Sequence, residues 1–144
     1  MSSRFVQHSL PFNAASDIAG YAPVKFFGAS NGVRAVVGIA TTNEEPVGIT
    51  GERGASGGAP VTIYGPGNVM QGVAGATVTD AGDVGIVGAT TVAGPSGNFS
   101  QPLLGPVSGA SGGRVFRLGV SNQPAVPGQV FSFYVSPRQL SGLA

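Results

Sequence analysis

The chain has 144 residues, of which 42% are hydrophobic, 25 are glycine, 11 are proline and none is cysteine. Its 7 basic and 6 acidic residues make up 9% of the chain and leave a formal charge of +1, against a charged fraction of roughly 25% in an ordinary soluble domain. This composition excludes disulfides and thiolate metal sites, provides no basic cluster for nucleic acid, and predicts one folded domain whose weakly charged surface is covered by a partner.

Residues 1–16 are expected to form an N-terminal arm. This arm has a cation near its start but lacks the apolar core of a secretory signal. No uninterrupted apolar stretch in the chain approaches the ~20 residues of a membrane span. We therefore expect a soluble, unprocessed chain with no membrane partner. Phe5 and Phe12 of the arm are candidate contacts to an oligomer or a larger assembly.

A β-hairpin is predicted early in the following segment, which covers residues 17–120. Two runs rich in β-branched or aromatic residues, 24–27 and 33–39, flank the Asn-Gly pair at 31–32. Asn-Gly favours a two-residue hairpin turn because both central residues of that turn need a positive φ. The odd-numbered residues of the second run are expected on its buried face, with Arg34 on the other.

The pentapeptide Gly-Ala-Ser-Gly-Gly occurs twice, at residues 54–58 and 109–113. Each copy joins two strand-like runs, 47–50 to 61–64 and 103–107 to 115–118. A turn sequence is easily reused within a fold, so the repetition predicts two related hairpin units rather than a catalytic device.

Short strand-like runs separated by glycine turns occupy the rest of this segment, at residues 68–73, 76–79, 84–87 and 116–120. No window of a dozen residues has apolar positions at helical spacing without an interrupting glycine or proline. The expected fold is all-β: a small single-domain β-barrel or β-sandwich of short strands with glycine-rich turns and long loops.

Residues 121–144 are predicted to form a proline-bounded connector and a terminal strand. Alternation places Phe131, Phe133 and Val135 on one face, and these apolar side chains are too costly to leave in water. Two arrangements cover them: the strand closes the barrel of its own subunit, or it adds to a neighbouring subunit. Phe131, Phe133 and Tyr134 are therefore further candidate contacts.

No catalytic or metal-binding device is expected. Residues 54–58 formally match G-x-S-x-G, but a strand-like run follows where the nucleophile elbow has a helix, and the single histidine, His8, precedes Ser56. The acidic pairs at residues 44–45 and 80–83 are interpreted as a solvated pair and a turn. We predict no enzyme activity, no cofactor and no metal, with an esterase as a competing class.

Four segments form an ordered pattern: Ala-Gly-Tyr-Ala-Pro-Val-Lys at 19–25, Pro-Val-Gly-Ile-Thr at 46–50 continuing through 57–63, Ala-Gly-Ala-Thr-Val-Thr-Asp-Ala-Gly-Asp-Val at 74–84, and 104–107 continuing through 112–116. Taken in this order, they resemble the capsid cement (decoration) proteins of tailed bacteriophages. The sequence departs from the family pattern at Gly105-Pro106, which interrupts an expected strand, and in the extension 121–144.

The resemblance implies a structural protein on the outer surface of a phage capsid. Its partner would be the major capsid protein, at the seams between subunits, where it would stabilise the shell. Local three-fold positions of an icosahedral shell favour a homotrimer. The alternative is a receptor- or carbohydrate-binding module of a virion fibre or tail, which has fewer aromatic residues to support it because the chain has no tryptophan and 3 tyrosines.

Overall fold

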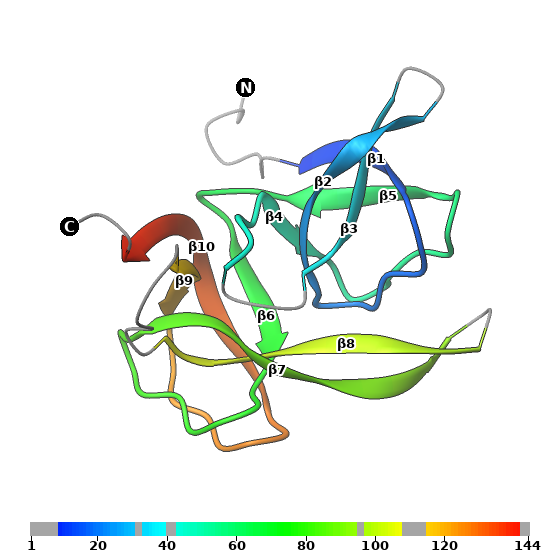
Figure 1. The fold of residues 1–144 in the computed structure, drawn as a ribbon. Coiled ribbons are helices and arrows are strands. Elements are labelled where there is room, and N and C mark those ends of the chain that lie inside the picture. Colours follow the sequence, from blue (N-terminus) through cyan, green and yellow to red (C-terminus); the bar gives the residue numbers. More distant parts are fainter. Residues whose placement is uncertain (1–8, 31–32, 40–42, 95–96, 108–114, 142–144) are drawn as a thin grey trace, which may run out of the picture.

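The structure, a computed structural model, describes residues 9–30, 33–39, 43–94, 97–107 and 115–141 (Figure 1). The described residues form ten strands and no helix, so the expectation of a small all-β domain is confirmed. The strands are β1 (Ser9–Ala14), β2 (Pro23–Ser30), β3 (Val33–Gly38), β4 (Gly48–Thr50), β5 (Pro60–Tyr64), β6 (Val69–Val73), β7 (Asp83–Gly94), β8 (Gly97–Pro106), β9 (Val115–Ser121) and β10 (Val130–Ser141).

The first five strands form a closed barrel in the order β1-β3-β2-β4-β5, here called the N-terminal unit. Its neighbouring strands are antiparallel except β1 and β3, which run parallel. The predicted hairpin is confirmed, because Ser30 of β2 pairs with Val33 of β3 across residues 31–32.

The last five strands, the C-terminal unit, repeat these connections. β6 pairs with β10, β10 with β9, β9 with β7 and β7 with β8, all antiparallel. Directly after β6, Ala74 forms a parallel bridge with Leu104 of β8, just as Ala14 of β1 pairs in parallel with Val36 of β3. Strands β1 to β5 therefore correspond one by one to β6 to β10.

Hydrogen bonds outside the strands follow the same correspondence. Thr50 Oγ1 accepts from the Ala22 amide at 2.9 Å and donates to the Ala19 carbonyl at 2.8 Å. The Ser121 hydroxyl at the end of β9 likewise accepts from the Gly82 amide at 2.9 Å and donates to the Thr79 carbonyl. Each hydroxyl satisfies a donor and an acceptor in the loop that leads into the second strand of its unit.

The two units share a core. One buried cluster combines Ile39 and Ile49 of the N-terminal unit with Leu104, Phe131 and Phe133 of the C-terminal unit. The β7–β8 hairpin also extends from the C-terminal unit beneath the N-terminal one (Figure 1), where Gln101 Nε2 donates to the Gly20 carbonyl at 2.8 Å. These contacts hold both units in one body.

The two pentapeptides do not mark equivalent hairpins. Residues 54–58 lie in the connection between the paired strands β4 and β5. The second pentapeptide, outside the described residues, falls between β8 and β9, and β7 separates these two strands in the sheet. The second predicted hairpin is therefore wrong, because a short glycine-rich peptide fits many loops and does not specify which strands pair.

Both ends of the described part of the chain are strands of the sheets. Residues 9–14 of the expected arm form β1, which pairs with β5 and β3 inside the N-terminal unit. The predicted terminal strand is β10, and it pairs with β6 and β9 of its own chain. Of the two arrangements considered for this strand, the structure has the one that closes its own subunit.

Candidate functional site

An aromatic patch on β2 is the first candidate surface. Phe26 is paired with Val36 and Ala29 with Arg34, so β2 has one residue more than β3 between these pairs, which defines a β-bulge. Gly28 inside the bulge has a φ of 95°, a left-handed conformation that favours glycine. The bulge breaks the alternation of the strand, and the consecutive side chains of Phe26 and Phe27 are 45% and 63% exposed.

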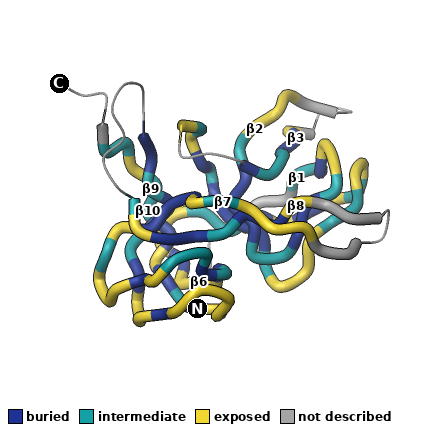
Figure 2. Tube along the Cα trace, turned by 60° about the horizontal axis from the view of Figure 1, so that its bottom comes forward, coloured by how far each residue is buried: buried dark blue, intermediate teal, exposed yellow. Residues whose placement is uncertain are grey.

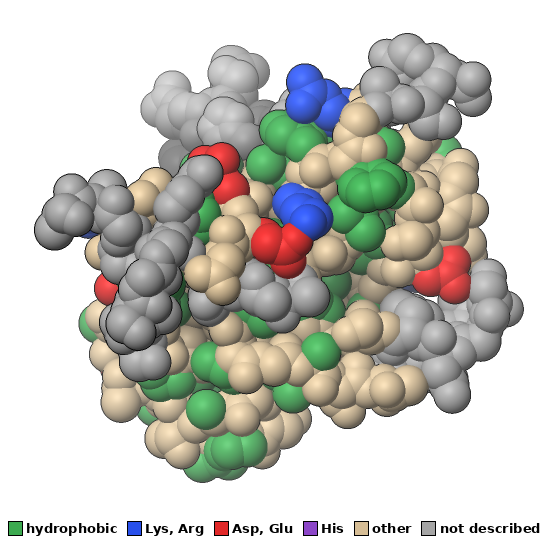
Figure 3. Space-filling model, in the orientation of Figure 1, with side chains coloured by type: hydrophobic (Ala, Val, Ile, Leu, Met, Phe, Trp, Pro, Cys, Tyr) green, Lys and Arg blue, Asp and Glu red, His purple; other side chains and the backbone are tan. Residues whose placement is uncertain are grey.

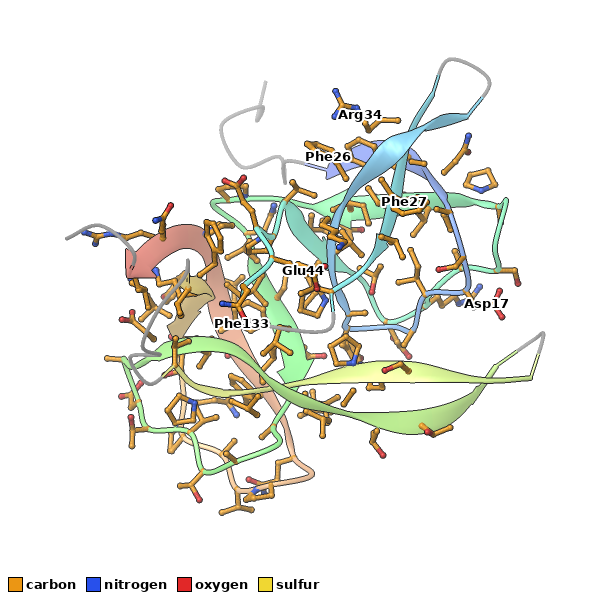
Figure 4. The ribbon with its side chains drawn as sticks, in the orientation of Figure 1. Asp17, Phe26, Phe27, Arg34, Glu44 and Phe133 are labelled. Carbon is orange, nitrogen blue, oxygen red and sulfur yellow. The ribbon has the colours of Figure 1, made fainter. Side chains whose placement is uncertain are left out.

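The Arg34 side chain lies over the ring of Phe26. Its guanidinium carbon lies 4.3 Å from the centre of the Phe26 ring, and Phe12 packs against the same ring with centroids 5.8 Å apart (Figure 4). The Arg34 cation thus occupies one face of an exposed aromatic ring. Figure 3 shows hydrophobic side chains gathered beside the basic ones on this face of the molecule. We call Phe12, Phe26, Phe27 and Arg34 the β2 patch.

The same position is covered in the C-terminal unit. Ile86 of β7 corresponds to Phe26, and an extra residue again follows it, because Ile86 pairs with Leu104 and Gly88 with Leu103. Ile86 is 8% exposed, and it lines a narrow crevice together with Pro23 and Ile39 of the N-terminal unit. Figure 2 shows the contrast between the exposed outer part of β2 and the buried start of β7. Within the described chain the β2 patch has no equivalent cover.

The candidate contact residues named from the sequence differ in how far the structure exposes them. Phe5 lies outside the described residues, and Phe12 is half-buried in the β2 patch. Phe131 and Phe133 are 1% and 0% exposed, so they present no surface to a partner. This corrects the prediction: their large apolar side chains are covered by the core of their own chain.

Tyr134 does remain accessible. It is 48% exposed and pairs across the β6–β10 ladder with Val69, itself 46% exposed. Sequence reasoning missed Phe26 and Phe27, although two consecutive aromatics followed by Gly28 are a recognisable sign of a bulge.

The segment that resembles a nucleophile elbow is a loop tied to the N-terminal unit. Asp17 Oδ1 accepts from the Gly57 amide at 2.8 Å, and the amide and carbonyl of Ala55 both bond to Ile18. β5 follows this loop, so Ser56 does not stand between a strand and a helix.

The acidic residues are dispersed. Asp83 pairs with Arg117 at 2.8 Å, and Glu44 pairs with Lys25. Within the described residues there is no group of three or more His, Cys, Asp or Glu side chains able to hold a metal ion. The described part of the chain also contains no helix long and apolar enough to span a membrane.

The fold just described has a counterpart among solved structures. The structure is similar to the crystal structure of the N base of the head fiber protein gp8.5 of bacteriophage phi29, with a TM-score of 0.59. The alignment covers 94% of this chain and 99% of the phi29 chain at 16% sequence identity, so the likeness establishes the fold. No protein family model and no curated protein matches the chain.

Proposed function

We propose that this chain is a non-enzymatic structural protein of a bacteriophage particle. It binds the outside of the assembled capsid at seams between major capsid protein subunits and stabilises the shell. The observation that carries this proposal is the fold, which matches the base of a head fiber over nearly the whole of both chains. The resemblance of four sequence segments to capsid cement proteins supports it independently.

The β2 patch is the surface proposed to contact the capsid. Phe26 and Phe27 are consecutive and both exposed, although their equivalents at the start of β7 include the buried Ile86. Burying a large apolar side chain gives about 1.5–3 kcal/mol, so covering this pair contributes substantially to attachment. With few charges available, attachment should lose little affinity between low and moderate salt.

Stabilisation of the shell follows from binding the assembled form alone. A ligand present at a hundred times its Kd stabilises each site it occupies by roughly 2.7 kcal/mol. We further propose a homotrimer on the particle, because three copies around a local three-fold position engage three seams together and gain avidity.

The test is co-sedimentation with heads of the same phage that lack this protein. Wild type is expected to pellet with the heads, and Phe27→Ser is expected to bind about tenfold more weakly, the equivalent of about 1.4 kcal/mol. Val126→Ser, which changes another exposed apolar side chain far along the chain, is the matched control and should bind as wild type. Failure of the wild-type protein to pellet with intact heads would refute capsid attachment.

A second candidate function is favoured by the same fold match: the chain is the base of a fibre mounted on the head. A cement protein and a fibre base both bind the shell, but only the cement protein needs to resist its rupture. Heads with and without the protein should therefore be heated while DNA release is followed. A higher release temperature for decorated heads supports the cement function, and an unchanged one supports the fibre base.

A further inference from the structure

A second surface, which shares no residue with the β2 patch, lies where the two units meet. It is a hollow of ≈410 Å³, inside the range of about 300–1,000 Å³ that is usual for ligand pockets. The N-terminal unit contributes Tyr21, Glu52 and Tyr64 to its lining, and the C-terminal unit contributes Gln71 and Ser132. Junctions between packed units are common places for ligand sites.

Gly51 leaves the ring of Tyr64 uncovered. A Cβ atom at position 51 would lie 3.4 Å from Cε2 of Tyr64, so a side chain there would start in contact with the ring. Gly51 is not in the left-handed region, and the corresponding residue of the C-terminal unit, beside Ser121, is Asn122. The backbone therefore does not require glycine at this position.

Tyr21 is likewise not required by the fold. It adopts a left-handed φ of 54°, and Ala81 has a φ of 60° at the corresponding place of the C-terminal unit. The Tyr21 amide donates to the Gly51 carbonyl at 2.9 Å, and Gln101, 8% exposed, fixes the neighbouring Gly20 carbonyl from β8. The turn holds its shape through the backbone, so the phenol at position 21 is free to serve binding.

The chemistry of the lining fits a neutral sugar. Two tyrosine rings offer apolar faces to the C–H faces of pyranose rings, while a carboxylate, an amide and a hydroxyl offer hydrogen bonds to sugar hydroxyls. The described residues that line this hollow include no cation, which disfavours phosphate and acidic sugars.

A second hollow of ≈400 Å³ adjoins the first, because Glu52 and Tyr64 line both. Thr62 and Arg53 extend the polar lining there, and the positive charge of Arg53 is balanced by the negative charge of Glu52, which lines both hollows. The two hollows together offer more surface than a single sugar ring covers, so a chain of several sugars fits better than a monosaccharide.

We propose that this junction binds a neutral oligosaccharide. Tyr21 and Tyr64 pack against sugar rings, and Glu52, Gln71 and Ser132 bond to their hydroxyls. This activity goes beyond the proposed attachment to the capsid. A capsid-bound protein with such a site would also attach the particle to a glycan-covered surface.

The test is isothermal titration of the full-length protein with three probes: tetrasaccharides of glucose, of galactose and of N-acetylglucosamine. At least one is expected to bind. Tyr21→Ala and Gly51→Asn, which install the residues found in the C-terminal unit, should each weaken that binding about tenfold, since a stacked ring contributes on the order of 1 kcal/mol. Both variants should keep the wild-type melting temperature.

Phe27→Ser separates this site from capsid attachment. It should bind the sugar as wild type does while pelleting less with heads, and Tyr21→Ala should show the opposite pattern. The oligosaccharide proposal is overturned if none of the three probes binds, or if the binding probe is unaffected by Tyr21→Ala and Gly51→Asn. Neither result would alter the co-sedimentation that tests capsid attachment.

Discussion

The N-terminal and C-terminal units share their strand connections but differ in what covers them. The bulge of β7 begins at Ile86, which is buried beside Pro23 and Ile39 of the other unit. The bulge of β2 begins at Phe26, which is 45% exposed. The two equivalent strands therefore differ in their contacts: β7 packs against the other unit, while β2 has an uncovered aromatic surface.

The comparison also separates residues that the fold needs from residues that it tolerates. Thr50 and Ser121 differ by one methyl group and make the same pair of hydrogen bonds. Tyr21 and Ala81 occupy the same left-handed turn with very different side chains. A residue type that occurs at the corresponding position of both units indicates a role in stabilising the fold. A residue type that occurs in only one unit indicates a role other than stabilising the fold, such as binding.

The largest effect on stability is expected at Phe133 and Ile63, two core residues that occupy corresponding positions in the two units. Phe133→Ala should destabilise the protein by about 3–5 kcal/mol and Ile63→Ala by about 2–5 kcal/mol, because each leaves a cavity in a buried cluster. Since one cluster contains residues of both units, either change should shift a single unfolding transition. Urea unfolding followed by circular dichroism measures this, and two resolved transitions would mean that the units unfold independently.

Two glycines at corresponding positions, Gly48 and Gly119, test how closely neighbouring strands approach in each unit. A Cβ atom at Gly119 would lie 1.9 Å from the Tyr134 carbonyl oxygen, and one at Gly48 would lie 2.6 Å from that of Tyr64. Gly119→Ala should therefore cost about 3 kcal/mol and Gly48→Ala somewhat less, as expected of overpacking. Gly38→Ala is the control because its Cβ would meet nothing within 4 Å. Equal stability of all three variants, measured by urea unfolding, would contradict the contacts described.

The matched hydroxyls should have matched effects. Thr50→Val and Ser121→Ala each leave an amide and a carbonyl without their partner, buried in the first case and part-buried in the second, at a cost of about 1–2 kcal/mol. Thr62→Val, on the exposed side of β5, should change stability by less than about 0.5 kcal/mol. Thermal unfolding of the three variants checks this, and a cost confined to one of the two units would break the equivalence.

The smallest effect on stability is expected at the exposed bulge residues Phe27 and Val87. Phe27→Ser and Val87→Ser should each change the free energy of unfolding by less than about 0.5 kcal/mol, because the side chains are 63% and 43% exposed. The two variants are expected to differ in attachment to heads, which Phe27→Ser should weaken and Val87→Ser should leave unchanged. A large loss of stability in Phe27→Ser would place this ring in the fold instead of at an interface.

Local pattern was sufficient for several parts of the structure. The Asn-Gly pair at residues 31–32 predicted the β2–β3 hairpin, since turn chemistry acts within a few residues. Alternation in the last strand predicted that Phe131, Phe133 and Val135 share a buried face, and all three are at most 1% exposed. The glycine-interrupted periodicity likewise predicted an all-β domain.

Other features depended on contacts between distant parts of the chain. On the odd-numbered face of β3, predicted to be the buried one, Ala35 and the following Ile39 are buried as expected, but Val36 of the opposite face is completely buried as well. Val36 belongs to the core of the N-terminal unit, a burial that follows from barrel closure and not from the pattern of this strand alone. The five-strand correspondence is carried by pairing such as Ala74 with Leu104, 30 residues apart in the sequence.

The sequence by itself determined that the chain forms short strands, where one tight turn lies and which face of its last strand is apolar, because these properties arise from neighbouring residues. Tertiary structure decided which strands pair, that Phe133 is buried while Phe27 is exposed, and that Tyr21 and Tyr64 line one hollow. The physical reason is that strand pairing and surface shape depend on backbone hydrogen bonds and packing across the whole fold. A short sequence pattern contains no information about these contacts between distant residues.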